Sequence, residues 1–104
     1  MAHGLGKQAA SFAMPASTVT YTGHVQGVGF RYSVKQIAAG FEVCGTVQNL
    51  EDGSVKLLAQ AFDAEELQAF LEAIDNSHLR GHIERRQIEA LPMQKGLRGF
   101  QIVK

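Results

Sequence analysis

Apolar and polar residues alternate strictly in residues 17–25, STVTYTGHV. Val19, Tyr21, Gly23 and Val25 share one face of an extended chain there, and the threonines share the other. A two-residue period with β-branched side chains is typical of a strand. We therefore predict a first strand whose threonine face is the more polar one.

From Phe30 the apolar period lengthens to that of a helix. Apolar residues fall at i, i+4, i+7, i+8 and i+11: Phe30, Val34, Ile37, Ala38 and Phe41. They form one helical stripe, and Gly40 lies near the expected end of the helix, where glycine is favoured.

Two further strand patterns, residues 43–49 and residues 54–62, flank the sequence LEDG. Asp-Gly between two strand patterns is a strong hairpin signal, so these strands are predicted to be antiparallel neighbours. Asp52 is expected to serve the turn. Asn49, just before it, is also a residue type common in turns.

A second helix is predicted from Asp63, whose side chain can cap unpaired N–H groups, with Glu66 three residues later as in a capping box. Its stripe consists of Leu67, Phe70, Leu71 and Ile74. Residues 82–91 form a weaker strand pattern. Ile83 and Ile88 have opposite parity in it, which indicates a late start or a bulge.

The closing residues, GFQIVK, complete the order β-α-β-β-α-β plus a short final strand. This is the split βαβ order of an α+β, ferredoxin-like fold, with two helices on one face of a mostly antiparallel sheet. We assign residues 17–104 to one domain. Residues 1–16 lack periodicity and are interpreted as a flexible N-terminal extension, the alternative being a segment that covers the active site.

Composition narrows the function. Lys plus Arg is 10 and Asp plus Glu is 10, so the basic excess of a general nucleic-acid binder is missing. Cys44 is the only cysteine, which excludes an intramolecular disulfide and thiol–metal clusters. With neither a signal-peptide pattern nor a membrane-span pattern, we expect a cytoplasmic protein without membrane contact. No feature demands more than a monomer.

The sequence HVQGVGFR, residues 24–31, joins the first strand pattern to the first helix pattern. Glycines allow successive N–H groups at a helix N-terminus to form an anion-binding nest, and arginine matches phosphate oxygens. The predicted phosphate loop consists of Gln26, Gly27, Val28, Gly29, Phe30 and Arg31. Phe30, the first residue of the helical stripe, should anchor the loop to the core. The alternative is a structural turn with an exposed arginine, and neither a dinucleotide fingerprint nor a Walker A loop fits.

Three motifs together resemble the acylphosphatase family: GHVQGVGFR at residues 23–31, VCGTVQNLEDGSV at residues 43–55 and RGFQI at residues 98–102. The resemblance implies metal-independent hydrolysis of the carboxyl–phosphate bond of a small-molecule acyl phosphate, without a cofactor. It also implies Arg31 as the catalytic arginine that binds phosphate, and Asn49 as the residue that orients the attacking water.

The first helix and the second strand of a split βαβ unit can bring Arg31 and Asn49 to the same end. Asn49 has the parity of Val47 and Gly45, the face expected under the helices. A carboxylate leaving group, whose conjugate acid has a pKa of about 4, needs no prior protonation. Positioning and charge stabilisation can therefore suffice without a catalytic histidine or carboxylate.

We assign no catalytic or metal-binding role to the remaining histidines, the cysteine and the paired arginines. His24 is expected to face solvent, His78 and His82 lack an evident third metal ligand, Cys44 lacks an activating partner, and Arg85–Arg86 reads as a solvated patch. Three alternative functions are an RNA-binding module, which would need aromatics on the third strand, a non-catalytic regulatory domain, and a domain serving carbamoyl-phosphate chemistry in a larger maturation protein. The end of the chain at Lys104 favours a free-standing enzyme among these.

Overall fold

A computed structural model describes residues 15–104 and shows a single five-stranded sheet with two helices. In chain order the elements are β1 (Ala16–Gly23), α2 (Phe30–Ala38), β2 (Cys44–Asn49), β3 (Val55–Gln60), α3 (Ala64–Asp75), the 3-10 helix η1 (His78–His82), β4 (Ile83–Leu91) and β5 (Phe100–Val103). Residues 1–14, which include most of the predicted extension, lie outside the described residues.

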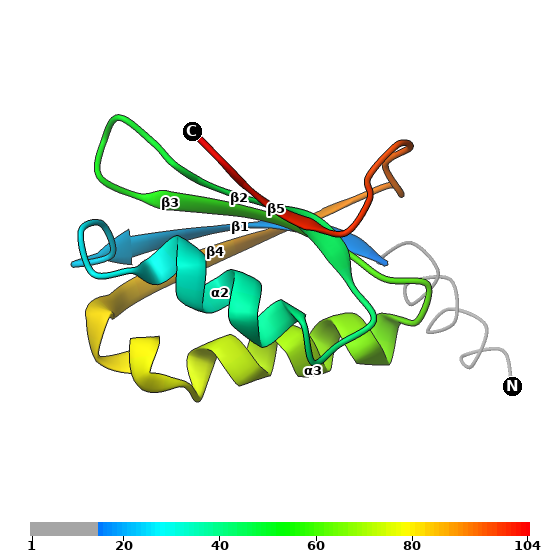
Figure 1. Ribbon diagram of the computed structural model, residues 1–104, viewed down its shortest axis with the longest axis horizontal. Coiled ribbons are helices and arrows are strands. Elements are labelled where there is room, and N and C mark those ends of the chain that lie inside the picture. Colours follow the sequence, from blue (N-terminus) through cyan, green and yellow to red (C-terminus); the bar gives the residue numbers. More distant parts are fainter. Residues whose placement is uncertain (1–14) are drawn as a thin grey trace, which may run out of the picture.

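The strand order is β4-β1-β3-β2-β5. β1 pairs with both β3 and β4, and β2 pairs with β3, all antiparallel, whereas β2 and β5 are parallel. Both helices cover the same face of this sheet (Figure 1). The predicted ferredoxin-like α+β fold with a mostly antiparallel sheet is therefore confirmed.

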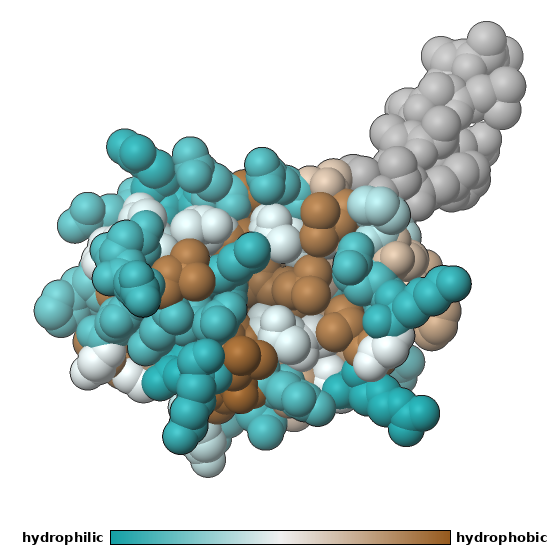
Figure 2. Space-filling view, turned by 90° about the horizontal axis from the view of Figure 1, so that it is seen from above, coloured by the Kyte–Doolittle hydropathy of each residue, from teal (hydrophilic) through white to brown (hydrophobic). Residues whose placement is uncertain are grey.

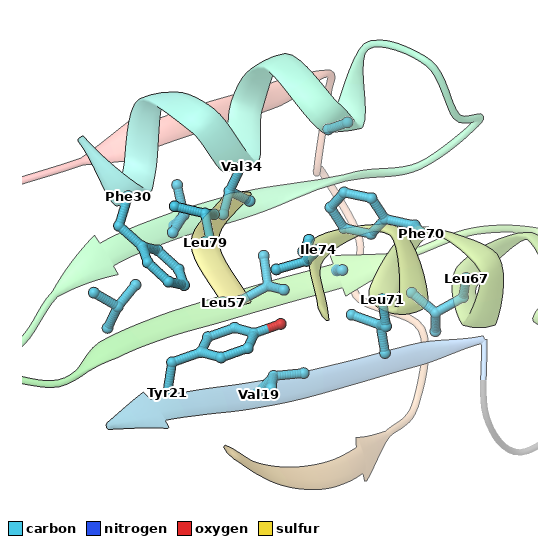
Figure 3. Close-up of a cluster of buried hydrophobic side chains, with 14 of the residues drawn as sticks. Val19, Tyr21, Phe30, Val34, Leu57, Leu67, Phe70, Leu71, Ile74 and Leu79 are labelled. Atoms are coloured by element: carbon cyan, nitrogen blue, oxygen red, sulfur yellow. The ribbon is translucent and has the colours of Figure 1, made fainter. Parts of the chain in front are cut away.

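The core lies between the helices and the sheet. Val19 and Tyr21 of β1 and Leu57 of β3 point toward the helices and are fully buried (Figure 3). Both helical stripes meet them there, through Val34 and Phe70 among others. The alternation read from the sequence thus identifies the buried face correctly.

The opposite face of the sheet carries the β1 threonines, which are half-buried. Seen from above, the molecule presents mainly hydrophilic side chains with a few apolar ones between them (Figure 2). The strand register places one apolar residue, Leu58 of β3, on the same face as its partners Thr18 and Thr46. The prediction of a more polar outer face agrees with this view.

A register shift in β4 explains the parity of its isoleucines. Thr22 of β1 pairs with Arg85, but the next residue, Gly23, pairs with Ile83, so β4 carries one extra residue there. The bulge lets Ile83 pack against the core, although its parity differs from that of Ile88. The bulged strand was thus one of the two expected possibilities.

The same strand register places the two neighbouring arginines of β4 on opposite faces of the sheet. Arg86 pairs with Tyr21 and so lies on the helix face, where its guanidinium forms an ion pair with Asp75 at the end of α3. Arg85 is exposed on the other face. The interpretation of both arginines as a solvated patch is therefore wrong for Arg86.

The start of α3 differs from the expected capping box in one respect. The Asp63 carboxylate accepts from the Glu65 N–H at 2.9 Å, as an N-cap should. The Glu66 carboxylate, however, accepts from the backbone N–H of Glu42 at 2.8 Å, and so ties α3 to the segment between α2 and β2. The expectation that Glu66 completes a capping box was wrong, because its carboxylate instead binds a backbone N–H 24 residues away in the chain.

The contrast between the two arginines of β4 predicts different effects on stability. Arg86→Ala removes the ion pair with Asp75 and the aliphatic stem beside Tyr21, so we expect the free energy of unfolding to fall by about 1 kcal/mol. Arg85→Ala is the matched control and should stay within about 0.5 kcal/mol of the unsubstituted protein. Urea denaturation measures both, and equal losses would contradict the facing assigned to Arg86.

Candidate active site

The loop between β1 and α2 is shaped by two glycines with left-handed backbones. Gly27 has φ of 80° and Gly29 has φ of 75°. A side chain at either position would meet no neighbouring atom, so backbone conformation, not space, is what requires glycine there. The predicted curl of the loop is thus present at both glycines.

The first turn of α2 lacks the usual features that satisfy a helix N-terminus. Gly29 is its N-cap and offers no side-chain acceptor, and no acidic residue lies in the first turn. Within residues 15–104, no hydrogen-bond acceptor is found for the backbone N–H groups of residues 27–32. These donors and the positive end of the helix dipole favour an anion.

Arg31 adds a full positive charge at this same end of the helix. A cation in the first turn opposes the helix dipole and costs stability. The one ion pair found in the described part of the chain is Arg86–Asp75, so no carboxylate there neutralises Arg31. By contrast, α3 begins with an aspartate cap followed by Glu65 and Glu66. The start of α2 therefore favours a negatively charged group, unlike the start of α3.

Phe30 holds the loop to the core as expected. Its side chain is 2% exposed and points from the first turn of α2 toward Tyr21, with ring centroids 5.2 Å apart (Figure 3). The ring planes are inclined by 54°, within the range that aromatic pairs favour. The helix start, and with it the adjacent N–H groups, is fixed by this contact.

Gln26 ties the loop to the β2–β3 hairpin. Its side-chain amide donates to the carbonyl oxygens of Leu50 at 2.8 Å and Ser54 at 2.9 Å. These residues bracket the turn that directly follows Asn49. The side chain of Gln26 thus fixes the distance between the phosphate loop and the end of β2, a role that the sequence did not reveal.

Asp52 stabilises the hairpin turn, as expected from the Asp-Gly sequence. Its carboxylate accepts from the Ser54 hydroxyl at 2.6 Å and from the Ser54 N–H at 2.9 Å. The hydroxyl, followed by the N–H, lowers the pKa of Asp52 below its ordinary value of 3.8. A lowered pKa stabilises the folded hairpin above pH 3.8, and this contribution is lost as the pH falls through the folded-state pKa.

Arg31 and Asn49 line one cavity of about 180 Å³. The complete lining is Val25, Gly27, Gly29, Phe30, Arg31, Tyr32, Asn49 and Ile102. Asn49 is half-buried at the end of β2, and its side-chain amide has no hydrogen-bond partner within residues 15–104. The cavity therefore combines a positive charge, unpaired N–H donors and an amide free to bind a water molecule.

The cavity includes some of the predicted loop residues and omits others. Gln26 and Val28 do not line it, because the Gln26 side chain turns to the hairpin and Val28 packs against the core. Tyr32 and Ile102 line it although the sequence analysis did not single them out. The sequence contains one signal that Tyr32 could line the site: Tyr32 directly follows Arg31 and lies outside the apolar stripe of the helix.

The three histidines of residues 15–104 lie outside the cavity lining. His24 is exposed, as expected, and its ring centroid lies 6.0 Å from that of His82. His78 Nε2 is 3.1 Å from the Ser33 hydroxyl. In residues 15–104 no three His, Cys, Asp or Glu side chains gather as metal ligands would. No helix among these residues is long and apolar enough to cross a membrane.

Comparison with known proteins identifies the family of this chain. The family model for acylphosphatase matches residues 17–102, which is most of the chain. The chain belongs to the acylphosphatase family. An acylphosphatase of Listeria welshimeri is 48% identical over 62 residues, which cover 60% of this chain and 66% of that protein, slightly under two thirds of its length.

Longer matches to other acylphosphatases cover the whole fold. The Lactobacillus johnsonii acylphosphatase is 35% identical over 91 residues, covering 86% of this chain and 99% of that protein. The crystal structure of the Bacillus subtilis acylphosphatase superposes with a TM-score of 0.77 at 32% identity, covering 86% of this chain and 98% of that one. The family and the fold therefore agree over most of the chain.

The clamp formed by Gln26 is open to a direct test in this acylphosphatase-family chain. Gln26→Ala removes two hydrogen bonds to hairpin carbonyls, so the loop and Asn49 should lose their fixed separation. We expect kcat for an acyl phosphate to fall about tenfold while KM changes less, because alignment and not phosphate affinity is affected.

Gln48→Ala is the matched control. The side-chain amide of Gln48 donates to the backbone carbonyl of Lys104 and does not contact the loop. Its kcat should remain within about twofold of the unsubstituted protein, as for a surface substitution. An unchanged kcat in Gln26→Ala would show that the clamp does not position Asn49.

The hydrogen bonds in the hairpin turn predict that the pKa of Asp52 depends on Ser54. Ser54→Ala removes the hydroxyl that is the main cause of the low pKa of Asp52, so the pKa of Asp52 should rise toward 3.8. NMR of the Asp52 carboxyl carbon against pH measures it. Ser77→Ala, which removes a hydroxyl bonded to Ile74, is the control and should leave Asp52 unchanged. A fall in the pKa of Asp52 on Ser54→Ala would refute the assigned cause.

Proposed function

We propose that this chain hydrolyses the carboxyl–phosphate bond of acyl phosphates in the cavity between the 26–31 loop and the end of β2. The products are a carboxylate and inorganic phosphate, and no metal or cofactor takes part. The observation that carries the proposal is the meeting of Arg31, the N–H groups of the α2 N-terminus and Asn49 around one cavity.

The phosphoryl group occupies the positive end of α2. Its oxygens accept from the unpaired N–H groups of residues 27–31, and the Arg31 guanidinium forms charge-assisted hydrogen bonds with them. Both contacts strengthen as negative charge is redistributed over the phosphoryl oxygens in the transition state. Arg31 is therefore the catalytic residue that binds and stabilises the phosphoryl group.

Asn49 orients the attacking water. Its side-chain oxygen accepts a hydrogen bond from the water, which aligns the water oxygen with phosphorus. The water oxygen–phosphorus bond forms as the phosphorus–carboxyl oxygen bond breaks, and the bonding electron pair leaves on the carboxylate. The proton released by the water passes to the phosphate product or to solvent, so no side chain needs to act as a base.

The proposal needs only one copy of the domain, because Arg31, Asn49 and the 26–31 loop of one chain already meet around the cavity. We therefore infer that a monomer is sufficient for turnover. We also propose that residues 1–16 are not required, since Arg31, Asn49 and the 26–31 loop, which carry the proposed reaction, all lie outside that segment.

Replacement of either catalytic side chain tests the proposal. Arg31→Ala and Asn49→Ala should each lower kcat/KM for benzoyl phosphate by about 100-fold or more, the loss typical when one preorganised transition-state contact is removed. The assay contains EDTA, and activity of the unsubstituted protein should not depend on added divalent metal.

Two controls separate catalysis from folding. Arg85→Ala removes an exposed arginine of β4, and Asn76→Ala removes an exposed asparagine after α3, so both should retain normal rates. Circular dichroism should show an intact fold in all four variants. Near-normal turnover in Arg31→Ala or Asn49→Ala would overturn the site assignment, and no metal-independent turnover by the unsubstituted protein would overturn the proposed function.

A further inference from the structure

Two exposed apolar side chains border the proposed catalytic cavity. Tyr32 is 62% exposed and Ile102 is 37% exposed. Large hydrophobic side chains are rarely left this open without a role when they gather at a concave site. Within residues 15–104 the other exposed members of this class are Phe62, Ile88 and Met93, none of which lines the cavity.

Tyr32 and Ile102 reach the cavity from different elements. Tyr32 follows Arg31 in the first turn of α2. Ile102 lies on the edge strand β5, in register with Val47 of β2, and so shares the helix-covered face with Val47 and Asn49. Because α2 packs against both β2 and β5, the two side chains flank the same opening.

The polar groups of the cavity are already used by the proposed reaction. Arg31 and the loop N–H groups bind the phosphoryl group, and Asn49 binds the water. Apart from the Tyr32 hydroxyl, the rest of the lining is aliphatic, aromatic or glycine, so no charged side chain is left to bind a charged acyl group. An acyl group that extends from the bound phosphoryl group therefore meets mainly apolar side chains, of which Tyr32 and Ile102 are the exposed ones.

We propose that Tyr32 and Ile102 form the acyl-binding wall of the site and that it selects acyl phosphates with an aromatic or branched apolar acyl group. This inference rests on the proposed function and assigns the half of the substrate that the phosphate loop does not contact. An aromatic acyl group can pack against the Tyr32 ring and bury surface of Ile102. An acetyl group offers a single methyl to the same wall.

The test compares kcat/KM for benzoyl phosphate and acetyl phosphate in each variant, which cancels the different intrinsic reactivity of the two substrates. Tyr32→Ala should lower the value for benzoyl phosphate about tenfold, the size of one aromatic contact, and that for acetyl phosphate at most about twofold. Tyr32→Phe should restore benzoyl phosphate turnover, because the ring and not the hydroxyl is needed. Ile102→Ala should shift the ratio in the same direction by about threefold.

Phe62→Ala is the matched control, because Phe62 is 97% exposed and lines a separate cavity with Cys44 and Met93. Its ratio should equal that of the unsubstituted protein. Equal losses on both substrates in Tyr32→Ala, or no loss, would overturn the acyl-binding wall while leaving hydrolysis established. Failure of the unsubstituted protein to hydrolyse either substrate would instead overturn the proposed function.

Inhibition by inorganic phosphate provides a second reading that does not depend on turnover of a particular acyl group. The inhibition constant should stay within about twofold in Tyr32→Ala, since phosphate does not reach the wall, and should rise strongly in Arg31→Ala. A large rise in Tyr32→Ala would place Tyr32 in phosphate binding and overturn its assignment to the acyl group.

Discussion

The packing of Phe30 against Tyr21 determines where α2 begins, and the proposed chemistry depends on that position. Phe30 is the first residue of α2 and Arg31 is the second, so the buried ring and the guanidinium that we propose to be catalytic belong to the same turn. The backbone N–H groups of this turn lie along the helix axis, so the orientation of α2 sets their direction. A shift of Phe30 in the core would move every phosphate-binding group of the site together, which is why a loop with two left-handed glycines can still present a defined anion site.

The second anchor of the loop acts across the sheet. Through Gln26, the loop is bonded to the hairpin that follows Asn49, and the hairpin is itself stiffened by Asp52 and Ser54. The loop and the end of β2, which we propose to bind phosphate and water, thus lie on different elements but are joined by hydrogen bonds. This coupling satisfies the geometric demand of an in-line displacement, in which the water must lie opposite the leaving group.

Sequence patterns predict the elements, the buried faces and the phosphate loop because each depends on local periodicity or turn chemistry. The hairpin at Asp52-Gly53 and the anchoring of Phe30 are of this kind. Contacts between residues far apart in the chain could not be predicted in the same way. The Gln26 amide bonds to residues 24 and 28 positions later, and Ile102 meets the cavity only because β5 pairs in parallel with β2. The face of the sheet on which Arg86 lies depends on where β4 bulges. The opposite parity of Ile83 and Ile88 indicates a bulge, but no local pattern specifies its position.

The two helices of this chain show how function departs from the rules that stabilise structure. α3 begins with Asp63 as its cap and two glutamates in its first turn, the arrangement that satisfies donors and complements the dipole. α2 begins with a glycine cap, no acidic residue and Arg31, which leaves the donors unpaired and adds charge of the unfavourable sign. In a chain of zero net charge, this concentration of positive potential is local and not a consequence of composition. In the proposed function, binding of a phosphoryl group at this helix start removes both penalties at once, so the energetic cost in the free protein contributes to binding where the reaction is proposed to take place.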